Sequence, residues 1–480
     1  MTTTPLFIEV DPAARQSLHD QVYHGLRQAM ADGRLSPGDY LPSTRALADD
    51  LRVGRNTVLR ALDRLKAEGL VEGHVGSGTR VTKAVQVPQP FPMRDTGLAA
   101  QPPPRAFEVG QGPLDVFPSR TWARVAAHRW RESTDQLITS GDACGYRPLR
   151  EVIAEYVRLA RGIECRADEV LITSGAQHAV DIIARALLRA GDAVLVEDPG
   201  RRDVRCALES ASLRALPIAI DREGFNVTRA TRATDARMAI VTPGAHFPSG
   251  IVLPMRRRQQ LVDWARRTNA WLVEDDQYAV TRFVGRSPPT LHRVDSGEHT
   301  VFVGSFAHVM FPGMRIGYIV APPSARDRLL NARTLSEQHA PTSTQAILAD
   351  FVGGGHLARH LRRYRATIGE RYHALVRGLA MRCGGVLDPW PASAGIQMIA
   401  WLPCGFSELA VVEAAARHGV VLEALSSYRY EAGRPGLVLG FGGWTPQEIS
   451  DATARLGRAL AQTGVTVGRT SSRGSAVGAF

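Results

Sequence analysis

Lysine is almost absent from this 480-residue chain. Only Lys66 and Lys83 occur, and arginine supplies the rest of the 58 basic residues. A general preference for arginine explains such a bias at surface positions, but arginine cannot replace a primary amine where a reaction needs one. Chemistry that depends on a lysine amine is therefore excluded beyond residue 83.

Cysteine pairs and long apolar runs are also missing. The five cysteines are odd in number and form no CxxC pair: Cys144, Cys165, Cys206, Cys383 and Cys404. This pattern favours reduced thiols over a disulfide framework or a metal site. No stretch reaches the roughly 18 apolar residues of a membrane span, and no secretory signal pattern opens the chain. We expect a cytoplasmic protein with no membrane segment and no metal.

What the chain does contain is enough length for two or three domains with sizeable cores. Its net charge of +11 permits binding to nucleic acid without establishing it. Residues 1–83 hold 11 Lys and Arg against 10 Asp and Glu, so this segment is almost neutral. Any DNA-binding role of the segment must therefore rest on where its arginines lie.

Apolar residues at helical spacing predict three helices in residues 1–83, at about 14–32, 44–51 and 55–68. Ser43 is a suitable N-cap for the second helix. A glycine-rich segment at 70–81 predicts a hairpin. Three helices and a hairpin indicate a winged helix-turn-helix, whose third helix would enter the major groove of DNA. The alternative on pattern alone is a small helical domain with a solvated arginine face.

Four segments of this region resemble the motif series of GntR-type bacterial regulators. They are Leu41–Ala48, Arg55–Val58, Leu65–Leu70 and Gly76–Thr79. The resemblance implies that residues 1–83 bind a double-stranded DNA operator. The DNA contacts expected from pattern and resemblance together are Arg45, Arg55, Asn56, Thr57 and Arg60, with Gly76 and Gly78 shaping the wing.

Composition changes after residue 83. Residues 84–106 contain six prolines and little periodicity, which predicts a semi-extended tether. Alternating strand and helix patterns over 107–464 predict an α/β fold, with a mostly parallel sheet and helices on both faces. Residues 465–480 are rich in Ser, Gly and Arg and are expected to form a disordered tail.

Five segments of the larger region occur in the order found in fold-type-I aminotransferases. They are Gly145–Arg150, Ser174–Gln177, Pro248–Gly250, Glu274–Asp276 and Phe311–Tyr318. Joined to a GntR-type head, this region resembles the MocR group, transcription regulators whose aminotransferase-like domain senses pyridoxal phosphate or an amine. The resemblance implies a smaller C-terminal α+β subdomain, a homodimer, and a small effector that is phosphorylated or otherwise anionic.

A strand, a glycine turn and a helix at 170–188 form a natural phosphate site, because free amides and the helix dipole both favour an anion. By resemblance, Asp275 would hold the nitrogen of a pyridinium ring. The residues that would bind the phosphate are Gly175, Ala176, Gln177, Ser305 and Arg315.

The same region departs from the family pattern at four positions. His308 stands where the family has its Schiff-base lysine, and Gln277 replaces a tyrosine that touches the ring hydroxyl. Arg201 replaces the aromatic residue that stacks on the ring. Val438 stands where a carboxylate-binding arginine is often found, for which Arg434 is a candidate substitute.

His308 has three interpretations: a space-filling residue, a hydrogen-bond partner of a noncovalent ligand, or a catalytic base beside a noncovalent pyridoxal or pyridoxamine phosphate. We expect a transcription regulator with no catalytic residues and no covalent cofactor, so pyridoxal phosphate could bind only noncovalently. The alternatives are a His308-dependent enzyme that also binds DNA, and a constitutive DNA-binding protein whose large domain only dimerises.

Overall fold

The computed structural model describes residues 8, 10–12, 16–74, 78–82, 106–132, 134–230 and 235–463. Contacts divide the chain into two units, Met1–Pro102 and Pro103–Phe480, and each is described by itself. Gly76, Lys83, the expected tail and all but the last residue of the expected tether lie outside the described residues. Within the described part, no helix is both long and apolar enough to cross a membrane.

The first unit contains the three helices and the hairpin that the sequence predicts. Its elements are α1 (Leu18–Ala31), α2 (Thr44–Asp50), α3 (Arg55–Ala67), β1 (Val71–His74) and β2 (Gly78–Val81). Helix α1 begins later than expected, because the side chain of Ser17 accepts from the amide of Asp20 and starts the helix there. The strands are antiparallel, and a core shared by all three helices holds the unit together.

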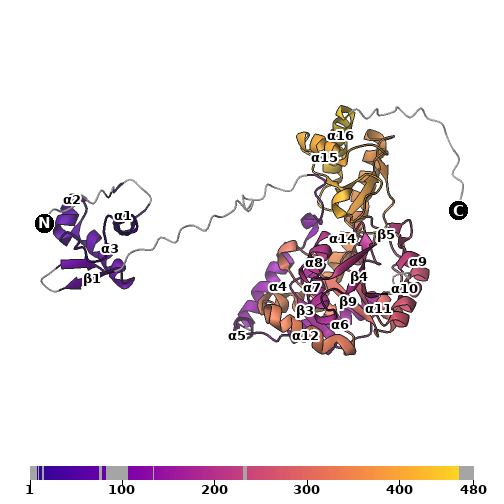
Figure 1. Ribbon diagram of the computed structural model, residues 1–480, viewed down its shortest axis with the longest axis horizontal. Coiled ribbons are helices and arrows are strands. Elements are labelled where there is room, and N and C mark those ends of the chain that lie inside the picture. Colours follow the sequence, from indigo (N-terminus) through magenta and orange to yellow (C-terminus); the bar gives the residue numbers. More distant parts are fainter. Residues whose placement is uncertain are drawn as a thin grey trace. The chain divides into compact units, whose positions relative to one another are not determined.

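The second unit is built on an eight-stranded sheet in the order β3-β10-β9-β8-β7-β4-β5-β6 (Figure 1). The strands are β3 (Val170–Thr173), β4 (Ala193–Asp198), β5 (Arg214–Asp221), β6 (Gly224–Phe225), β7 (Ala236–Val241), β8 (Trp271–Asp275), β9 (Thr300–Ser305) and β10 (Gly317–Val320). The run from β9 through β8, β7 and β4 to β5 is parallel, as predicted. Strands β10 and β6 are antiparallel to their neighbours, so the sheet is mixed at its two ends.

Helices cover both faces of this sheet because successive strand residues point to opposite sides. In β4, Val194 and Val196 pack with α7 (Ala176–Leu187) and α8 (Arg202–Ser210), while Ala193 and Leu195 pack with α10 (Met255–Thr268). The remaining helices of the large layer are α4 (Ser119–Glu132), α5 (Thr134–Ile138), α6 (Arg147–Arg161), α9 (Val227–Ala230), α11 (Leu291–Asp295), α12 (Pro323–Glu337) and α13 (Thr342–Gly353). This arrangement confirms the predicted α/β class.

The C-terminal part forms a smaller α+β layer at one end of this unit (Figure 1). Its antiparallel strands are β11 (Asp388–Pro389), β12 (Gln397–Trp401), β13 (Glu423–Ala424) and β14 (Gly436–Gly440), and its helices are α14 (His356–Arg382), α15 (Glu408–Arg417) and α16 (Pro446–Gln462). The end of β4 is tied to this layer, because Asp198 accepts from the amides of Tyr430 and Glu431. The segment that follows Asp198 is thereby held in place beside the C-terminal end of β8.

Candidate functional site

Helix α3 presents the residues expected to read DNA. Its buried side is Val58, Ala61, Leu62 and Leu65, while Arg55, Asn56 and Arg60 are exposed and Thr57 is partly exposed. Gly54 caps the helix without a side-chain hydrogen bond, while its carbonyl accepts from the amide of Thr57 at 2.9 Å. Arg45 is exposed on α2. Among the described residues, no ion pair or hydrogen bond occupies the guanidinium groups of Arg45, Arg55 or Arg60, so they are available for an external partner.

Two neighbouring basic residues are committed within the unit. Arg64 donates to Asp20 at 2.9 Å and its guanidinium lies 4.0 Å from the ring centre of Tyr23. The Nε of Arg80 donates to the carbonyl of Gly38 at 3.2 Å. In the wing, Gly78 has φ +94°, a backbone conformation that a residue with a Cβ rarely adopts. The contacts of Arg64 and Arg80 stabilise the fold, whereas Arg45, Arg55 and Arg60 face outward and can meet DNA.

The expected phosphate residues gather at the N-terminus of α7. Gly175 caps the helix with φ +100°, and a Cβ placed on it would lie 3.6 Å from Cζ of Arg315. Arg315 is exposed and itself has φ +49°, which is uncommon for a residue other than glycine. Gln177 is exposed and Ala176 is buried, while the buried Ser305 accepts from the amide of Ala307. Helix amides and one guanidinium therefore converge on one place.

Acidic and histidine side chains border this place. Glu337 accepts a hydrogen bond from Ser174 and lies 3.4 Å from Nδ1 of His178. Arg333 lies 3.6 Å from the same carboxylate and offsets its charge. The hydroxyl of Ser174 is thus occupied, which leaves Arg315 and the α7 amides to attract an anion.

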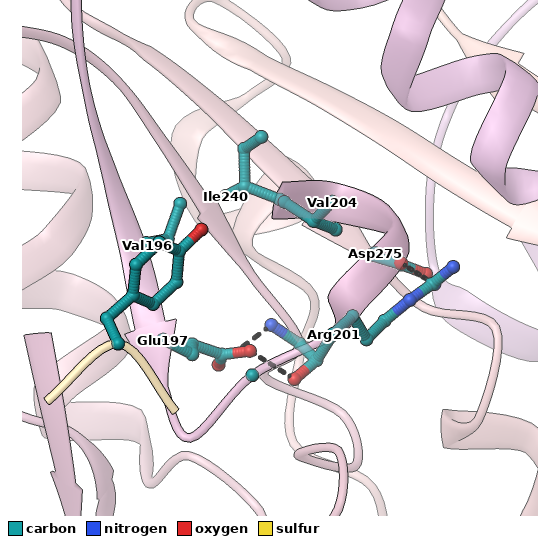
Figure 2. A pocket seen from close by; sticks show the side chains of 9 residues that line it. Val196, Glu197, Arg201, Val204, Ile240 and Asp275 are labelled. Carbon is teal, nitrogen blue, oxygen red and sulfur yellow. Dashed lines mark hydrogen bonds and ion pairs between the residues drawn. The ribbon is translucent and has the colours of Figure 1, made fainter. Parts of the chain in front are cut away.

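Strand β8 ends in three consecutive acids that pair with three arginines from different parts of the chain. Glu274 lies 3.5 Å from Arg258 of α10, and Asp276 lies 2.5 Å from Arg161 of α6. Burial raises the pKa of Asp276 to about 7 despite the opposing effect of Arg161. The middle acid, Asp275, pairs with Arg201 (Figure 2). All three carboxylates are buried, and each therefore needs its partner.

Arg201 joins two carboxylates through three of its nitrogens. Nη1 donates to Asp275, while Nε donates to Asp203 at 2.9 Å and Nη2 donates to the other oxygen of Asp203. Figure 2 shows the side chain extending from the start of α8 toward Asp275. Gln277 adds two donors to Asp275, its amide at 3.2 Å and its side chain at 3.0 Å. Desolvation raises the pKa of Asp275, and the charge of Arg201 opposes that effect.

The space next to this ion pair is small. A cavity of about 20 Å³ lies between Arg201, Asp275, Glu197, Thr242 and Tyr430, which is room for roughly one water. Pockets for ring-containing ligands span roughly 300 Å³ or more. The carboxylate that would hold a pyridinium nitrogen already accepts three hydrogen bonds and has no exposed surface. These residues do not fit a pyridoxal ring in this arrangement.

His308 lies in the loop between β9 and β10. The centre of its ring lies 4.6 Å from that of Tyr278 with the planes tilted by 32°, and its carbonyl accepts from the hydroxyl of Tyr364 at 2.8 Å. Desolvation and then the nearby charge of Arg201 lower the pKa of His308 to about 4, although part of the residue remains accessible to solvent. The imidazole is therefore neutral near pH 7.

The lowered pKa of His308 predicts a loss of stability in acid. The unfolded chain binds a proton at this residue near pH 6.5 and the folded chain near pH 4, so the stabilisation is complete above 6.5 and is lost as the pH falls toward 4. We expect His308→Gln to remove about 2 kcal/mol of the difference in unfolding free energy between pH 7 and pH 4.5. Urea unfolding at the two pH values measures it.

Exposed His128 provides the control for this prediction. His128→Gln should leave the pH dependence close to that of the unaltered chain. Buried His246, whose pKa burial lowers to about 3, contributes in the same direction, so some acid sensitivity should persist in His308→Gln. An unchanged pH dependence in His308→Gln would contradict the assignment.

The two C-terminal positions lie elsewhere. Val438 is buried in β14, where it pairs in register with Ile399. Arg434 is exposed, donates to Asp388 at 3.2 Å and lies 5.2 Å from the ring centre of Trp401. The cavity that Arg434 lines has no residue in common with the cavity beside Arg201 and Asp275. In the cavity beside Arg201 and Asp275, Arg434 therefore does not replace the carboxylate-binding arginine that the family often has at position 438.

Sequence reasoning identified Arg201 only as a missing aromatic residue, and it did not identify Asp203 or Tyr364. The spacing Arg201-x-Asp203 at the start of a helix was the available signal, because a bidentate pair within one turn is a common way to orient a guanidinium. No local signal pointed to Tyr364, which is more than fifty residues away from His308.

Comparisons with known proteins divide the chain in two. Residues 18–81 match the family of bacterial regulatory proteins called the gntR family, and residues 107–439 match aminotransferase class I and II. The chain is 33% identical to the probable rhizopine catabolism regulatory protein MocR of Rhizobium meliloti, over 92% of this chain and 93% of that protein. It is 30% identical to the pyridoxine biosynthesis transcriptional regulator PdxR of Corynebacterium glutamicum, over 93% of this chain and 98% of that protein.

A solved structure shares the fold of the second unit. The α-aminoadipate aminotransferase LysN of Thermus thermophilus, complexed with N-(5'-phosphopyridoxyl)-L-leucine, superposes with a TM-score of 0.70 at 25% identity. The similarity covers 75% of this chain and 92% of that enzyme. The larger part of the chain therefore has the fold of an enzyme family that binds pyridoxal phosphate.

Proposed function

Because this chain belongs to the MocR-type transcription regulators, in which a GntR-family DNA-binding domain is joined to an aminotransferase class I and II domain, we propose that its large domain senses a ligand, dimerises, and does not transaminate. One observation carries the proposal: no lysine follows residue 83. By the resemblance to the aminotransferases, His308 would stand where the family has its Schiff-base lysine. Without a primary amine, the domain has no side chain that can hold pyridoxal phosphate covalently.

The DNA-binding half of the proposal depends on α3. Its outward residues Arg55, Asn56 and Arg60 carry the donors that suit the edges of guanine and adenine in the major groove. Arg45 on α2 would contact phosphates beside it. The proposal places the protein in the bacterial cytoplasm, where its operator is found.

The place where an effector would bind is the N-terminus of α7. The amides that follow Gly175 and the exposed guanidinium of Arg315 favour a phosphorylated or carboxylate-bearing small molecule. Ser305 ends β9, and His308 follows three residues later, near enough to Arg315 for its charge to help lower the pKa of the histidine. Such a ligand would regulate transcription only if it favoured one arrangement of two DNA-binding domains over another.

Apolar surface on the second unit supports a homodimer. None of the 14 residues of helix α4 is fully buried, and Trp130 on this helix is 43% exposed. Two large apolar residues close to the helix in sequence are also exposed, Leu114 at 49% and Ile138 at 67%. A second copy of the chain that covered them would remove this apolar surface from water.

The alternative of a His308-dependent enzyme needs a cofactor ring next to the histidine. The neutral imidazole is chemically suited to accept a proton. The carboxylate that would hold the ring is Asp275, and it is already engaged by Arg201 and Gln277. The geometry therefore favours the regulator without an amino-transfer reaction.

Borohydride treatment after incubation with pyridoxal phosphate tests the proposal. We expect peptide mass spectrometry to find reduced adducts only at Lys66, Lys83 and the N-terminal amine, which serve as internal controls for nonspecific reaction. The same preparation, supplied with amino acid and keto acid pairs, should transfer no amino group. Steady amino-group transfer would overturn the proposal.

A further inference from the structure

The most unusual feature of the second unit is a buried arginine at the site where its enzyme relatives hold a cofactor ring. The side chain of Arg201 is 10% exposed and that of Asp275 is 0% exposed, so their contact is shielded from water. An unpaired ionised carboxylate at this depth would be strongly unfavourable, so Asp275 stays ionised only with a positive charge next to it. The chain itself supplies that charge.

The backbone that carries Arg201 is held tightly. A Cβ on Gly200 would lie 2.3 Å from the carbonyl oxygen of Glu197, so no larger residue fits there. The amide of Gly200 donates to the backbone carbonyl of Tyr428 at 2.9 Å. Arg201 then caps α8, with Asp203 in the first turn of that helix. Moving the guanidinium away from Asp275 would require a rotation that breaks its bidentate contact with Asp203 as well.

Other residues occupy the remaining hydrogen-bonding positions of the Asp275 carboxylate. Gln277, two residues further along the chain, donates to it from its amide and from its side chain. Glu197 lines the same small cavity and accepts from the amide and the hydroxyl of Thr242 at 3.0 and 2.6 Å. Burial raises the pKa of Glu197 to about 8, so this side chain is mostly protonated at pH 7 and adds little negative charge to attract a cationic ring.

We propose that Arg201 is a built-in substitute for a cationic ligand ring: its guanidinium neutralises Asp275 permanently, and the large domain keeps its folded arrangement without pyridoxal phosphate. The inference builds on the proposed function and goes beyond it, because it excludes noncovalent binding of the ring as well as covalent attachment. Any effector of this domain is recognised by its anionic group at α7 and Arg315, and its remaining atoms are not those of a pyridine ring next to Asp275.

Calorimetric titration of the full chain distinguishes ring recognition from phosphate recognition. The probes are inorganic phosphate and 4-deoxypyridoxine 5-phosphate, a pyridoxal phosphate analogue without the aldehyde that would react with Lys66 or Lys83. In the unaltered chain we expect the two probes to bind equally within about threefold, or neither to bind, because the ring gains no contact. Binding of the analogue that is tenfold or more tighter, roughly the contribution of one charge-assisted hydrogen bond, overturns the proposal.

Removal of the arginine provides the complementary result. In Arg201→Ala the analogue should bind about tenfold more tightly than in the unaltered chain, because its ring nitrogen can then pair with Asp275, while phosphate binding stays the same. Arg202→Ala is the matched control, since the side chain of Arg202 is 49% exposed and lies over Tyr428. If Arg201→Ala binds both probes as the unaltered chain does, Arg201 is not what excludes the ring.

The variant His308→Lys tests whether the ring can bind, without requiring that Arg201→Ala folds. In His308→Lys, borohydride reduction after addition of pyridoxal phosphate should modify residue 308 no more than the nonspecifically reacting Lys66 and Lys83, because Arg201 still fills the ring site. Stoichiometric modification of residue 308 would overturn the inference, while the unaltered chain would still lack a covalent cofactor and remain a regulator. Amino-group transfer by the unaltered chain would overturn the proposed function instead, so the two failures are distinguishable.

Discussion

Replacement of Arg55 by alanine is expected to abolish sequence-specific DNA binding. Arg55 is the first residue of α3, is exposed, and lies at the helix end that enters the major groove in this class of domain. A bidentate arginine–guanine contact contributes about 1–3 kcal/mol of discrimination, roughly tenfold to a hundredfold in affinity, and a dimer would lose it at both half-sites. Fluorescence anisotropy with an operator selected by the unaltered chain from random sequences measures the loss.

Arg27 provides the matched control for this prediction. It lies on α1, is exposed, and is 4.0 Å from Glu68 at the C-terminal cap of α3, so Arg27→Ala removes the same charge from the same unit while leaving the N-terminal turn of α3 unchanged. Its effect should be small and uniform across sequences, as expected from a change in net charge. Specific binding that survives Arg55→Ala at full strength would contradict the assignment of α3 as the reading helix.

Replacement of Arg201 by alanine is expected to produce a large loss of stability in the second unit. The substitution leaves Asp275 buried without its cationic partner, and removal of one member of a buried pair typically costs about 3–5 kcal/mol. Asp203, the second partner of Arg201, is more exposed than Asp275, so the loss of its contact should lower the unfolding free energy less. Urea unfolding followed by tryptophan fluorescence measures the change in unfolding free energy.

The double variant Arg201→Ala/Asp275→Asn tests the physical cause. Because it removes the unpaired charge together with its partner, it should recover a large part of the lost stability. Arg202→Ala, at the neighbouring exposed position, should cost about 1 kcal/mol or less. A double variant that is as unstable as Arg201→Ala would show that the arginine stabilises the domain by packing and not by pairing with Asp275.

The first unit could be predicted from the sequence almost completely. Its helices lie where apolar residues recur at helical spacing. In the third helix these residues are Val58, Leu62 and Leu65, and they are buried as expected. The error in the start of α1 has a local cause, since Ser17 caps the helix. In the second unit the parallel strands also lie where buried apolar runs place them, because a strand covered on both faces must be apolar throughout.

The pairing of charged residues could not be predicted. Glu274, Asp275 and Asp276 are adjacent in the sequence, and nothing in that run shows that their partners come from α10, from the start of α8 and from α6. Arg201 and Asp275 are 74 residues apart. Neither hydrophobic periodicity nor turn chemistry describes which side chains meet across a sheet, because both depend on neighbours along the chain.

The sequence by itself determined that a winged helix-turn-helix precedes an aminotransferase-like α/β domain and that no lysine amine is available beyond residue 83. The α/β class and the winged helix follow from local patterns, the aminotransferase-like assignment follows from the resemblance of five segments to a known family, and the missing amine follows from the identity of single residues. Only the tertiary structure decided what became of the ring site, because a buried ionised carboxylate depends on whichever cation the fold brings to it. Here that cation is Arg201, which the fold brings to Asp275 from the start of α8.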